Sequence, residues 1–405
     1  MLKTVSETMT SDLSKAEAVI QGSLGCVFPA AQIVVRWRGE TILSRAYGWL
    51  DPETQQRPVQ LDTLFDMASV TKLFVVTAFM TLVEEGKVAL DQPVCTVLPE
   101  FDGLRPIRAY DDPLKPGVFV DVVPPTDAMA DAGRVTFRNL LSHNSGLPAW
   151  RPLYKEGSPQ AARQLALTSF FSYPTGARVI YSDIGLILLG MSIERLTGLA
   201  LDQAIHQRVG QPLGLDHTCY LPIGSQRSAV CGQTDNVVPT EICAWRNRRI
   251  VGEVHDENAA GLGGVAGHAG IFSTATDTAA LGQMYLDSVG AGLVPAQGRP
   301  QGSPLLRAET VVEMRRLQVE DGVTQRGLGF VLWCSDPEAS GNPFSQQAFG
   351  HTGFTGTSLW IDPERDLVAA CLTNRVYYGR NAGGILAFRV ALHRAIVEAV
   401  DSIHG

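Results

Sequence analysis

The chain has 405 residues, of which 45% are hydrophobic, and a formal net charge of -8. This length and hydrophobic content are enough for a large buried core. The negative charge and the lack of any lysine or arginine run argue against nucleic acid or an anionic membrane surface as a partner. We therefore expect a small-molecule ligand.

The N-terminal residues contain no apolar stretch of the ~7 to 15 residues that a secretory signal needs. The apolar run at 73–83 is shorter than the ~20 residues that span a bilayer. We therefore predict a cytoplasmic protein with no membrane partner. The seven cysteines are scattered and form no C-x-x-C pair, which predicts reduced thiols instead of disulfides or a zinc site.

In the N-terminal part, the pattern predicts a polar helix at 11–23, followed by two strands. The strands are expected to meet at the turn Arg38-Gly39-Glu40. The next segment, VTKLFVVTAFMTLVEEG, is apolar on nearly every face and ends at Gly86. It predicts a buried central helix, in which a polar side chain would be costly unless it had a use.

Further along, long Pro- and Asp-bearing loops alternate with helical stretches such as VTFRNLLSH and YSDIGLILLGMSIERLTG. The last third predicts helices at 274–289 and 304–317 with a Pro/Gly-rich link at 292–304 between them. Three strand-like runs follow, GLGFVLWC, TGTSLWIDP and DLVAACLTNRV, and then a helix at 383–402. Strands near both chain ends, with helices between them, imply one sheet built from both ends.

The segment DMASVTK places Ser69 three residues before Lys72. Serine is a poor nucleophile unless a neighbour takes its proton, and residues three apart on a helix share a face. This is the only Ser-x-x-Lys pair in the chain. The alternative is structural: Ser69 would cap the helix and Lys72 would extend its ammonium to solvent.

Two later segments also contain candidate residues for catalysis or ligand binding. Tyr181 precedes the apolar helix in VIYSDIGLILLG, and His351-Thr352-Gly353 lies on a predicted edge strand, where glycine lets the backbone approach a ligand. The pieces in this order resemble the penicillin-recognising serine hydrolases, namely class C β-lactamases, DD-peptidases and their esterase relatives. The marks of those families are S-x-x-K, Y-x-N and K-T-G. The phrases LLSHNSGLP and GGVAGHAGIFSTATD are similar to further segments of that group.

This resemblance implies an α+β protein of the class C β-lactamase-like fold, an antiparallel sheet flanked by helices plus a mostly helical lobe. It divides the chain into an α/β lobe, 1–95 with 266–405, and a helical lobe, 96–265. The active site is expected between the two lobes. It also implies a hydrolase without a cofactor or a metal.

Carried over by position, the resemblance makes Ser69 the nucleophile and Lys72 its proton-accepting or proton-shuttling neighbour. Tyr181 becomes the second base and later the acid for the leaving group. The backbone N–H groups of Ser69 and Phe354 would bind the oxyanion. Physical reasoning predicts that apolar burial lowers the pKa of Lys72 and that the nearby amine lets Tyr181 ionise more easily.

Two residues depart from the family pattern. Asp183 stands where the β-lactamase pattern has asparagine, and His351 stands where it has lysine. The second lysine of penicillin-binding enzymes helps to hold the substrate carboxylate, and no lysine follows residue 155 here. We therefore expect anionic substrates to bind less well than uncharged esters or amides. An acidic Asp183 would also favour protonated Lys72, which shifts the general-base role toward Tyr181.

Other features have competing interpretations. GLGGVA fits a dinucleotide motif but follows a polar stretch instead of a strand. His255, Asp256, Glu257 and His268 could hold a metal, although a hydrogen-bonded loop at the cleft rim fits them better. His143 is expected to fix a loop. Four aromatic residues either line an acyl-binding wall or pack in the core: Trp150, Tyr154, Trp245 and Trp360.

Together these features predict a serine hydrolase acting on a small-molecule ester or amide, first of all a carboxylesterase. An acyltransferase on the same scaffold is an alternative, as is a weak β-lactamase or D-amino-acid peptidase. A catalytically silent binding protein is the least favoured interpretation, because none of Ser69, Lys72 and Tyr181 is lost.

Overall fold

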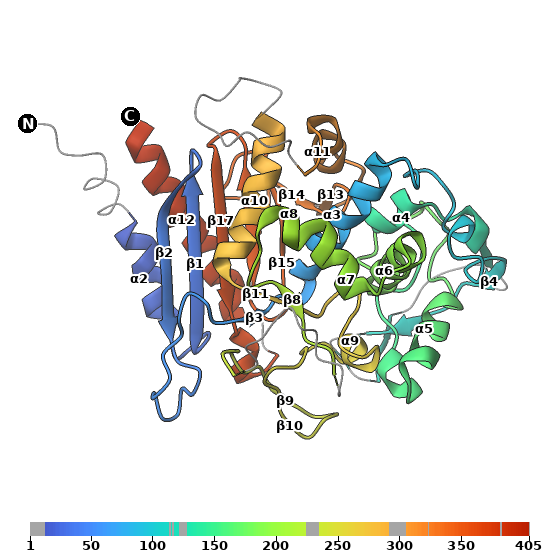
Figure 1. The fold of residues 1–405 in the computed structure, drawn as a ribbon, viewed down its shortest axis with the longest axis horizontal. Coiled ribbons are helices and arrows are strands. Elements are labelled where there is room, and N and C mark those ends of the chain that lie inside the picture. The colour runs from blue at the N-terminus through green and yellow to red at the C-terminus, as the bar shows by residue number, and fades with distance from the viewer. Residues whose placement is uncertain are drawn as a thin grey trace, which may run out of the picture.

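An antiparallel sheet forms one side of the molecule in the computed structural model (Figure 1). Within the described residues it has eight strands in the order β12-β13-β14-β15-β16-β17-β1-β2, so the first strands of the chain lie beside the last one. The structure describes residues 13–112, 115, 117–120, 128–223, 235–290, 305–322, 324–380 and 383–404.

The sheet confirms the predicted N-terminal hairpin. Its strands are β1 (Ala30–Trp37), β2 (Glu40–Gly48), β12 (Val319–Asp321), β13 (Thr324–Arg326), β14 (Val331–Leu332), β15 (Phe349–Thr352), β16 (Ser358–Asp362) and β17 (Leu367–Thr373). Arg38 and Gly39 join β1 to β2 with φ angles of 52° and 80°, which suits a tight hairpin turn. The strand predicted at 327–334 is wrong except for β14, because Gly329 turns the chain with a φ of 78°.

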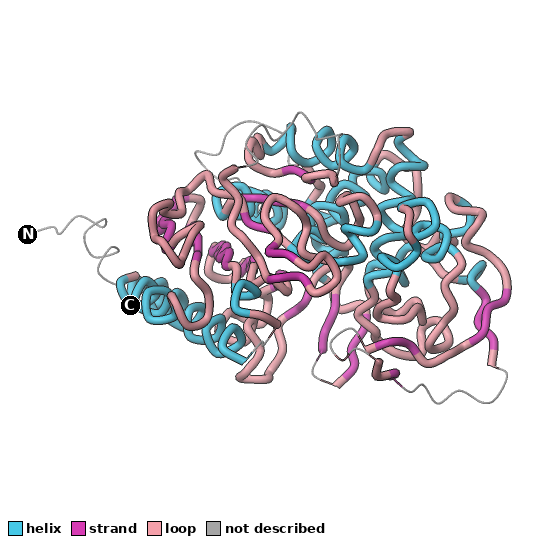
Figure 2. Tube along the Cα trace, turned by 90° about the horizontal axis from the view of Figure 1, so that it is seen from below, coloured by secondary structure: helices cyan, strands magenta, loops and turns pink. Residues whose placement is uncertain are grey.

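Helices cover both faces of the sheet. In β1, Val34 packs in one hydrophobic cluster, whereas Ile33 and Val35 pack in another, because successive side chains point to opposite faces. The Ile33 side is covered by α2 (Ser14–Ser23) and α12 (Gly383–His404), and the Val34 side by α10 (Ala275–Gly290). Figure 2 shows α12, with the C-terminus, on the outer side of the strands.

The predicted central helix is confirmed as α3 (Thr71–Glu84), and every residue from Thr71 to Leu82 is buried. Gly86 follows the end of α3, and its φ of 70° lets the chain turn away, while the Lys87 N–H donates to the Leu82 carbonyl oxygen at 3.0 Å. Lys72 is therefore a lysine in the middle of a core.

The remaining elements lie mostly beside α3 and away from the sheet (Figure 1). The helices are α4 (Phe137–Leu141), α5 (Pro159–Leu167), α6 (Asp183–Thr197), α7 (Leu201–Ile205), α8 (Gln211–Leu213), α9 (Glu257–Gly261) and α11 (Ala308–Arg315). Short strands pair as β4 (Leu104–Pro106) with β7 (Met129–Asp131), β5 (Tyr110–Asp111) with β6 (Phe119–Val120), and β9 (Ile242–Cys243) with β10 (Arg248–Arg249). In a three-stranded sheet, β11 (Ile271–Ser273) lies between β3 (Phe65–Asp66) and β8 (Cys219–Tyr220). The division into two lobes stays a prediction, and the link predicted at 292–304 lies outside the described residues.

The prediction of reduced thiols is wrong for Cys219, which is disulfide-bonded. Cys26, Cys95, Cys243, Cys334 and Cys371 are free. Sequence spacing could not show the disulfide, because pairing depends on how closely the fold brings two Cα atoms together. Cytoplasmic location stays a prediction that this bond does not support, since disulfides persist mainly in oxidising compartments.

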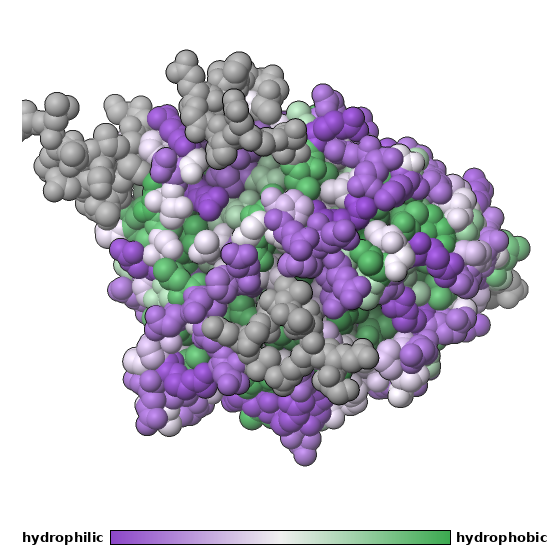
Figure 3. All heavy atoms as spheres, in the orientation of Figure 1, coloured by the Kyte–Doolittle hydropathy of each residue, from purple (hydrophilic) through white to green (hydrophobic). Residues whose placement is uncertain are grey.

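On the face seen in Figure 3, hydrophobic side chains form separate patches between hydrophilic ones. Among the described helices, no single one has both the length and the hydropathy of a membrane span. One bent pair, Asp183–Thr197 with Leu201–Leu213 at 79°, meets those criteria of length and composition together.

Candidate active site

Ser69 lies in a short 3-10 turn, Ala68–Val70, between β3 and α3. The turn is strained, because Ala68 has a φ of 46°, and its N–H is held by Asp66 Oδ1 at 2.8 Å. Ser69 is half-buried and its side chain makes no cap of α3. The alternative in which Ser69 serves as a helix cap is therefore wrong.

Lys72 makes three hydrogen bonds from one buried ammonium. Its side chain is 1% exposed, and Nζ donates to Ser69 Oγ at 3.0 Å, to Asp183 Oδ1 at 2.8 Å and to the His268 carbonyl oxygen at 3.1 Å. An ammonium has three donors and no acceptor, so this set of partners fits the charged form. The alternative in which Lys72 extends to solvent is wrong.

The charge on Lys72 follows from opposing effects. Burial lowers the pKa of Lys72, whereas the negative charge of Asp183 and the adjacent Tyr181 raise it. Together the two upward effects exceed the effect of burial, so the pKa lies above the ordinary value of 10.5. Burial therefore acts in the predicted direction, but the prediction of a lowered net pKa for Lys72 is wrong. The second prediction, that Asp183 favours protonated Lys72, agrees with the direction of the shift.

Tyr181 lies against the same ammonium. Its ring centroid is 4.7 Å from Lys72 Nζ, and the Ser182 side chain caps α6 immediately after it. The Tyr181 hydroxyl is buried and has no hydrogen-bond partner among the described residues. The structure thus brings together Ser69, Lys72 and Tyr181, and it adds Asp183 on Lys72.

The His351-Thr352-Gly353 segment differs in part from the prediction. β15 lies between β14 and β16, so it is not an edge strand, although His351 and Thr352 pair only with β16. His351 is buried, and this burial, with the charges of Lys72 and Arg326, holds its pKa well below 6.5. Its Nδ1 lies 2.8 Å from the Thr352 carbonyl oxygen, so the neutral ring donates its proton there.

His143 fixes a loop, as predicted. Its Nδ1 accepts the Ser182 N–H at 3.1 Å, and its ring lies 4.7 Å from that of Tyr181. Burial, followed by the charge of Arg326, holds the pKa of His143 well below 6.5. A neutral His143 therefore orients the start of α6 without adding charge to the site.

The segment after β15 is tied to the turn that carries Ser69. Thr355 Oγ1 donates to the Asp66 carbonyl oxygen at 2.7 Å, and Thr357 Oγ1 donates to that of Met67 at 2.8 Å. A Cβ at Gly353 would lie 2.6 Å from the Met67 carbonyl oxygen, so only glycine fits there. This contact brings the backbone around Phe354 against the turn of Ser69.

Phe354 itself is held in place by two neighbours. Arg375 Nε donates to the Phe354 carbonyl oxygen at 2.8 Å, and its guanidinium carbon lies 4.4 Å from the ring centroid. The His255 ring stacks on Phe354 with the centroids 5.7 Å apart. Within the described residues, the N–H groups of Ser69 and Phe354 donate to no other group, so they fit the predicted oxyanion-binding pair.

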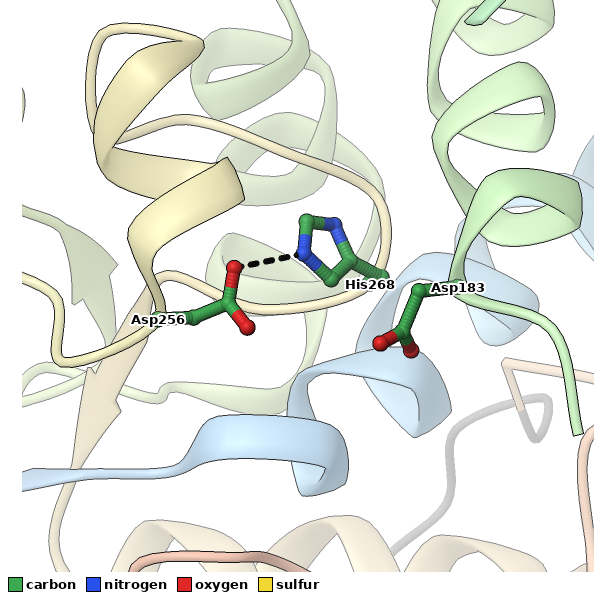
Figure 4. A group of neighbouring side chains, drawn as sticks. All are labelled: Asp183, Asp256 and His268. Carbon is green, nitrogen blue, oxygen red and sulfur yellow. Dashed lines mark hydrogen bonds and ion pairs between the residues drawn. The ribbon is translucent and has the colours of Figure 1, made fainter. Parts of the chain in front are cut away.

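A hydrogen-bonded pair of side chains lies beside Asp183 (Figure 4). His268 Nε2 lies 2.8 Å from Asp256 Oδ1, and Asp256 also caps α9 by accepting the Ala259 N–H. Their side-chain ligand atoms and that of Asp183 lie within 4.8 Å of one another, a spacing that could hold a metal. Asp183, however, already pairs with the Lys72 ammonium, so the hydrogen-bonded loop is the better interpretation.

The four aromatic residues divide between a partly exposed group and the core, and the acyl-binding wall stays a prediction for Trp150, Tyr154 and Trp245. Tyr154 has its ring centroid 6.3 Å from that of Trp150 and 4.9 Å from that of Trp245, which is 47% exposed. Trp360 is 1% exposed and stacks on Phe344 in the core, so its interpretation as a wall residue is wrong.

Sequence reasoning missed Arg326, the last residue of β13. Its guanidinium carbon lies 4.8 Å from the Tyr181 ring centroid, and its charge lowers the pKa of His143 and His351. The only sequence signal was an arginine directly before the strand-like GLGFVLW. Nothing in that pattern indicates contact with Tyr181.

The family described as Beta-lactamase matches residues 16–392 of the chain. The chain belongs to the β-lactamase family. Members of this family are serine hydrolases, and this chain is one of them; the predicted family and α+β fold class are confirmed.

Named relatives of this β-lactamase-family chain carry several activities. An N-acetylmuramyl-L-alanine amidase of Bacillus subtilis (strain 168) is 32% identical over 90% of this chain and 81% of its own length. A putative D-alanyl-D-alanine carboxypeptidase of Salmonella agona (strain SL483) is 28% identical over 90% of this chain and 82% of its own length. Among solved structures, the hydrolase EstCE1 and simvastatin synthase of Aspergillus terreus share the fold, with TM-scores of 0.70 and 0.71. Both are 19% identical; the first alignment covers 96% of this chain and 99% of the other, and the second covers 99% of each.

Proposed function

We propose that this β-lactamase-family hydrolase is a carboxylesterase, which cleaves an ester bond of a small molecule through an acyl intermediate on Ser69. One observation carries the proposal: Lys72 uses all three of its donors, one of them on Ser69 Oγ, while the Tyr181 hydroxyl has no partner in the described part of the chain. An ammonium cannot take a proton, so Tyr181 is left as the base.

The proposed acylation begins when Tyr181, in its phenolate form, takes the proton of Ser69 Oγ, and Oγ forms a bond to the carbonyl carbon. The carbonyl oxygen becomes an anion and accepts hydrogen bonds from the N–H groups of Ser69 and Phe354. Tyr181 then gives its proton to the leaving oxygen as the carbon–oxygen bond breaks. Lys72 stays charged throughout and stabilises the negative charge on the reacting oxygens.

Deacylation repeats the sequence with water. Tyr181 takes a proton from water, whose oxygen attacks the acyl carbon, and the proton then returns to Ser69 Oγ as the acid leaves. An alcohol or amine in place of water would give acyl transfer, an alternative that matches the word acyltransferase in the description of EstCE1.

Amide hydrolysis is the second candidate. It is favoured by the relatives named amidase and carboxypeptidase, which match 90% of this chain. The same steps apply, except that Tyr181 protonates a leaving nitrogen. A weak β-lactamase activity would use the same acylation and deacylation steps. A catalytically silent binding protein would carry out none of these steps.

Labelling with a fluorophosphonate tests the nucleophile. We expect one adduct per chain by intact mass, located on Ser69 by peptide mapping. A nitrophenyl ester and the nitroanilide of the same short acyl group then separate ester from amide cleavage, with a burst of one equivalent of nitrophenol expected. An adduct on another residue, or no adduct, would contradict the proposal, and a larger kcat/KM for the anilide would favour the amidase.

The Asp183→Asn variant tests the charge on Lys72. Without the carboxylate, burial is opposed by fewer negative charges, so the pKa of Lys72 falls. Because the proposed steps need the ammonium, the alkaline limb of the kcat/KM profile is expected to move to lower pH. At neutral pH we expect a loss of about tenfold or less, since asparagine can still accept from Lys72.

Asp256→Asn is the matched control for this measurement, because Asp256 pairs with His268 and not with Lys72. It should leave the alkaline limb unchanged. An unshifted limb in Asp183→Asn would show that Asp183 does not keep Lys72 charged.

A further inference from the structure

Arg389 of α12 is a buried cation that donates to backbone carbonyl oxygens. The residue is 6% exposed, and its Nη2 donates to the Gly353 oxygen at 2.8 Å and to the Thr357 oxygen at 2.9 Å. Burial, followed by the charge of Arg375, lowers the pKa of Arg389 to about 10, so the guanidinium is still charged at neutral pH.

This charge has no counter-charge in the described part of the chain. No described carboxylate acts on Arg389, and the one group whose negative charge would raise its pKa is the Cys371 thiol. Burial raises the pKa of that thiol to about 12, so Cys371 is neutral at pH 7. A buried charge without a counter-charge is costly, so the position of Arg389 needs an explanation.

The two carbonyl groups that Arg389 contacts close the turn between β15 and β16. The Gly353 N–H donates to the Thr357 oxygen at 2.8 Å, and the Gly356 N–H donates to the Gly353 oxygen at 3.1 Å. Arg389 reaches this turn from α12, which covers the face of the sheet opposite α10. One guanidinium thus bonds both ends of the turn that carries Phe354.

The Gly353 carbonyl belongs to the same peptide group as the Phe354 N–H. A peptide group is planar, and in its trans form the C=O and the N–H point in opposite directions. A Gly353 oxygen that is fixed on Arg389 therefore fixes the direction of the Phe354 N–H, the second donor of the oxyanion-binding pair. A positive charge on the oxygen also polarises the peptide group, which strengthens donation by its N–H.

We propose that Arg389 is a positioning residue, whose guanidinium orients and polarises the Gly353–Phe354 peptide group so that its N–H stabilises the oxyanion. The inference rests on the proposed function, because the oxyanion forms only when Ser69 attacks a carbonyl carbon. Arg389 and the substrate oxygen lie on opposite sides of this one peptide group. Arg389 therefore acts on the reaction through the backbone and not by touching the substrate.

A substrate with sulfur in place of the carbonyl oxygen tests the proposal, because sulfur accepts hydrogen bonds weakly. We would measure kcat/KM for a short-chain nitrophenyl ester and for its thiono analogue, in which C=S replaces C=O. The ratio of the ester value to the thionoester value is expected to fall about 10–100-fold in Arg389→Gln. This is less than the ~10² to 10³ that follows the removal of a whole donor, because the Phe354 N–H is weakened and not removed.

Arg389→Gln is expected to fold, since Arg389 has no counter-charge that the substitution would leave unpaired. Arg389→Met is a second neutral variant, which carries the same test if Arg389→Gln does not fold. Arg389→Lys keeps the charge but not the guanidinium, so its ratio should lie between those of the wild type and the neutral variants. Circular dichroism checks the fold of each variant.

Arg105→Gln is the matched control. Arg105 is 8% exposed, and its Nη1 also donates to two backbone carbonyl oxygens, those of Leu167 and Ser169, at 2.6 Å and 3.1 Å. Its loss should leave the ratio unchanged. An equal loss for both substrates in the neutral Arg389 variants would show a structural role alone, and an unchanged ratio would show no role; either result overturns the proposal. Failure of the wild type to be labelled on Ser69 by a fluorophosphonate would instead contradict the proposed function.

Discussion

Replacing Ser69 with alanine is expected to lower kcat/KM for the nitrophenyl ester at least about 10³-fold and to remove the burst. Alanine has no Oγ to bond to the carbonyl carbon, so no acyl-enzyme forms. The backbone N–H groups of Ser69 and Phe354 remain, and any residual rate would come from them and from substrate binding. The variant should fold but be about 1–3 kcal/mol less stable than the wild type, because it removes the Oγ that accepts a hydrogen bond from the buried Lys72 ammonium.

Ser192→Ala is the control for this experiment. Ser192 is a buried serine in α6 whose hydroxyl donates to the Leu188 carbonyl oxygen at 2.8 Å. Its loss should leave both the burst and the turnover in place. Equal turnover by Ser69→Ala and the wild type would rule out Ser69 as the nucleophile.

Lys72→Met is expected to lose both activity and stability. Methionine fills similar space but leaves the Asp183 carboxylate without its cation. Breaking a buried ion pair from one side costs about 3–5 kcal/mol of unfolding free energy, and the lower end applies because the Asp183 side chain is 19% exposed. Urea unfolding measures this loss, and ester turnover measures the loss of activity.

The stability that Lys72 contributes is expected to fall as the pH rises. The pKa of Lys72 is raised in the folded protein, so its contribution to stability is fully present below about pH 10.5 and is lost as the pH rises through the folded value. The stability difference between the wild type and Lys72→Met should therefore shrink only at strongly alkaline pH.

A double variant separates the two effects. Lys72→Met with Asp183→Asn removes the unpaired charge, so part of the lost stability should return while activity stays absent. If the double variant were no more stable than Lys72→Met, the Asp183 charge would not be the cause of the loss.

The parts of the site that sequence reasoning found are those that lie close together in the chain or on strongly patterned elements. Ser69 and Lys72 are three residues apart at the start of an apolar helix, and Tyr181 precedes another. Their proximity to His351 came only from the family resemblance, since no spacing shows that α3, α6 and β15 meet.

The properties that sequence reasoning missed depend on the combined effects of residues that are far apart in the chain. The charge of Lys72 is set jointly by burial, Asp183 and Tyr181, and burial alone gave the wrong sign. Arg326 sits on a strand of only three residues, too short for a periodic pattern to reveal its neighbours. Trp360 looked like a candidate for the cleft wall because composition cannot distinguish a core aromatic residue from a surface one.

The strand order has a consequence for synthesis on the ribosome. β1 pairs with β17, and Thr357 and Thr355 anchor the Phe354 segment to the turn that carries Ser69. Until residues 349–373 emerge, β1 therefore has an open edge and Ser69 lacks the second donor for its oxyanion. A nascent chain is thus expected to be inert toward esters, and to be most vulnerable to aggregation, until nearly all of it has been made.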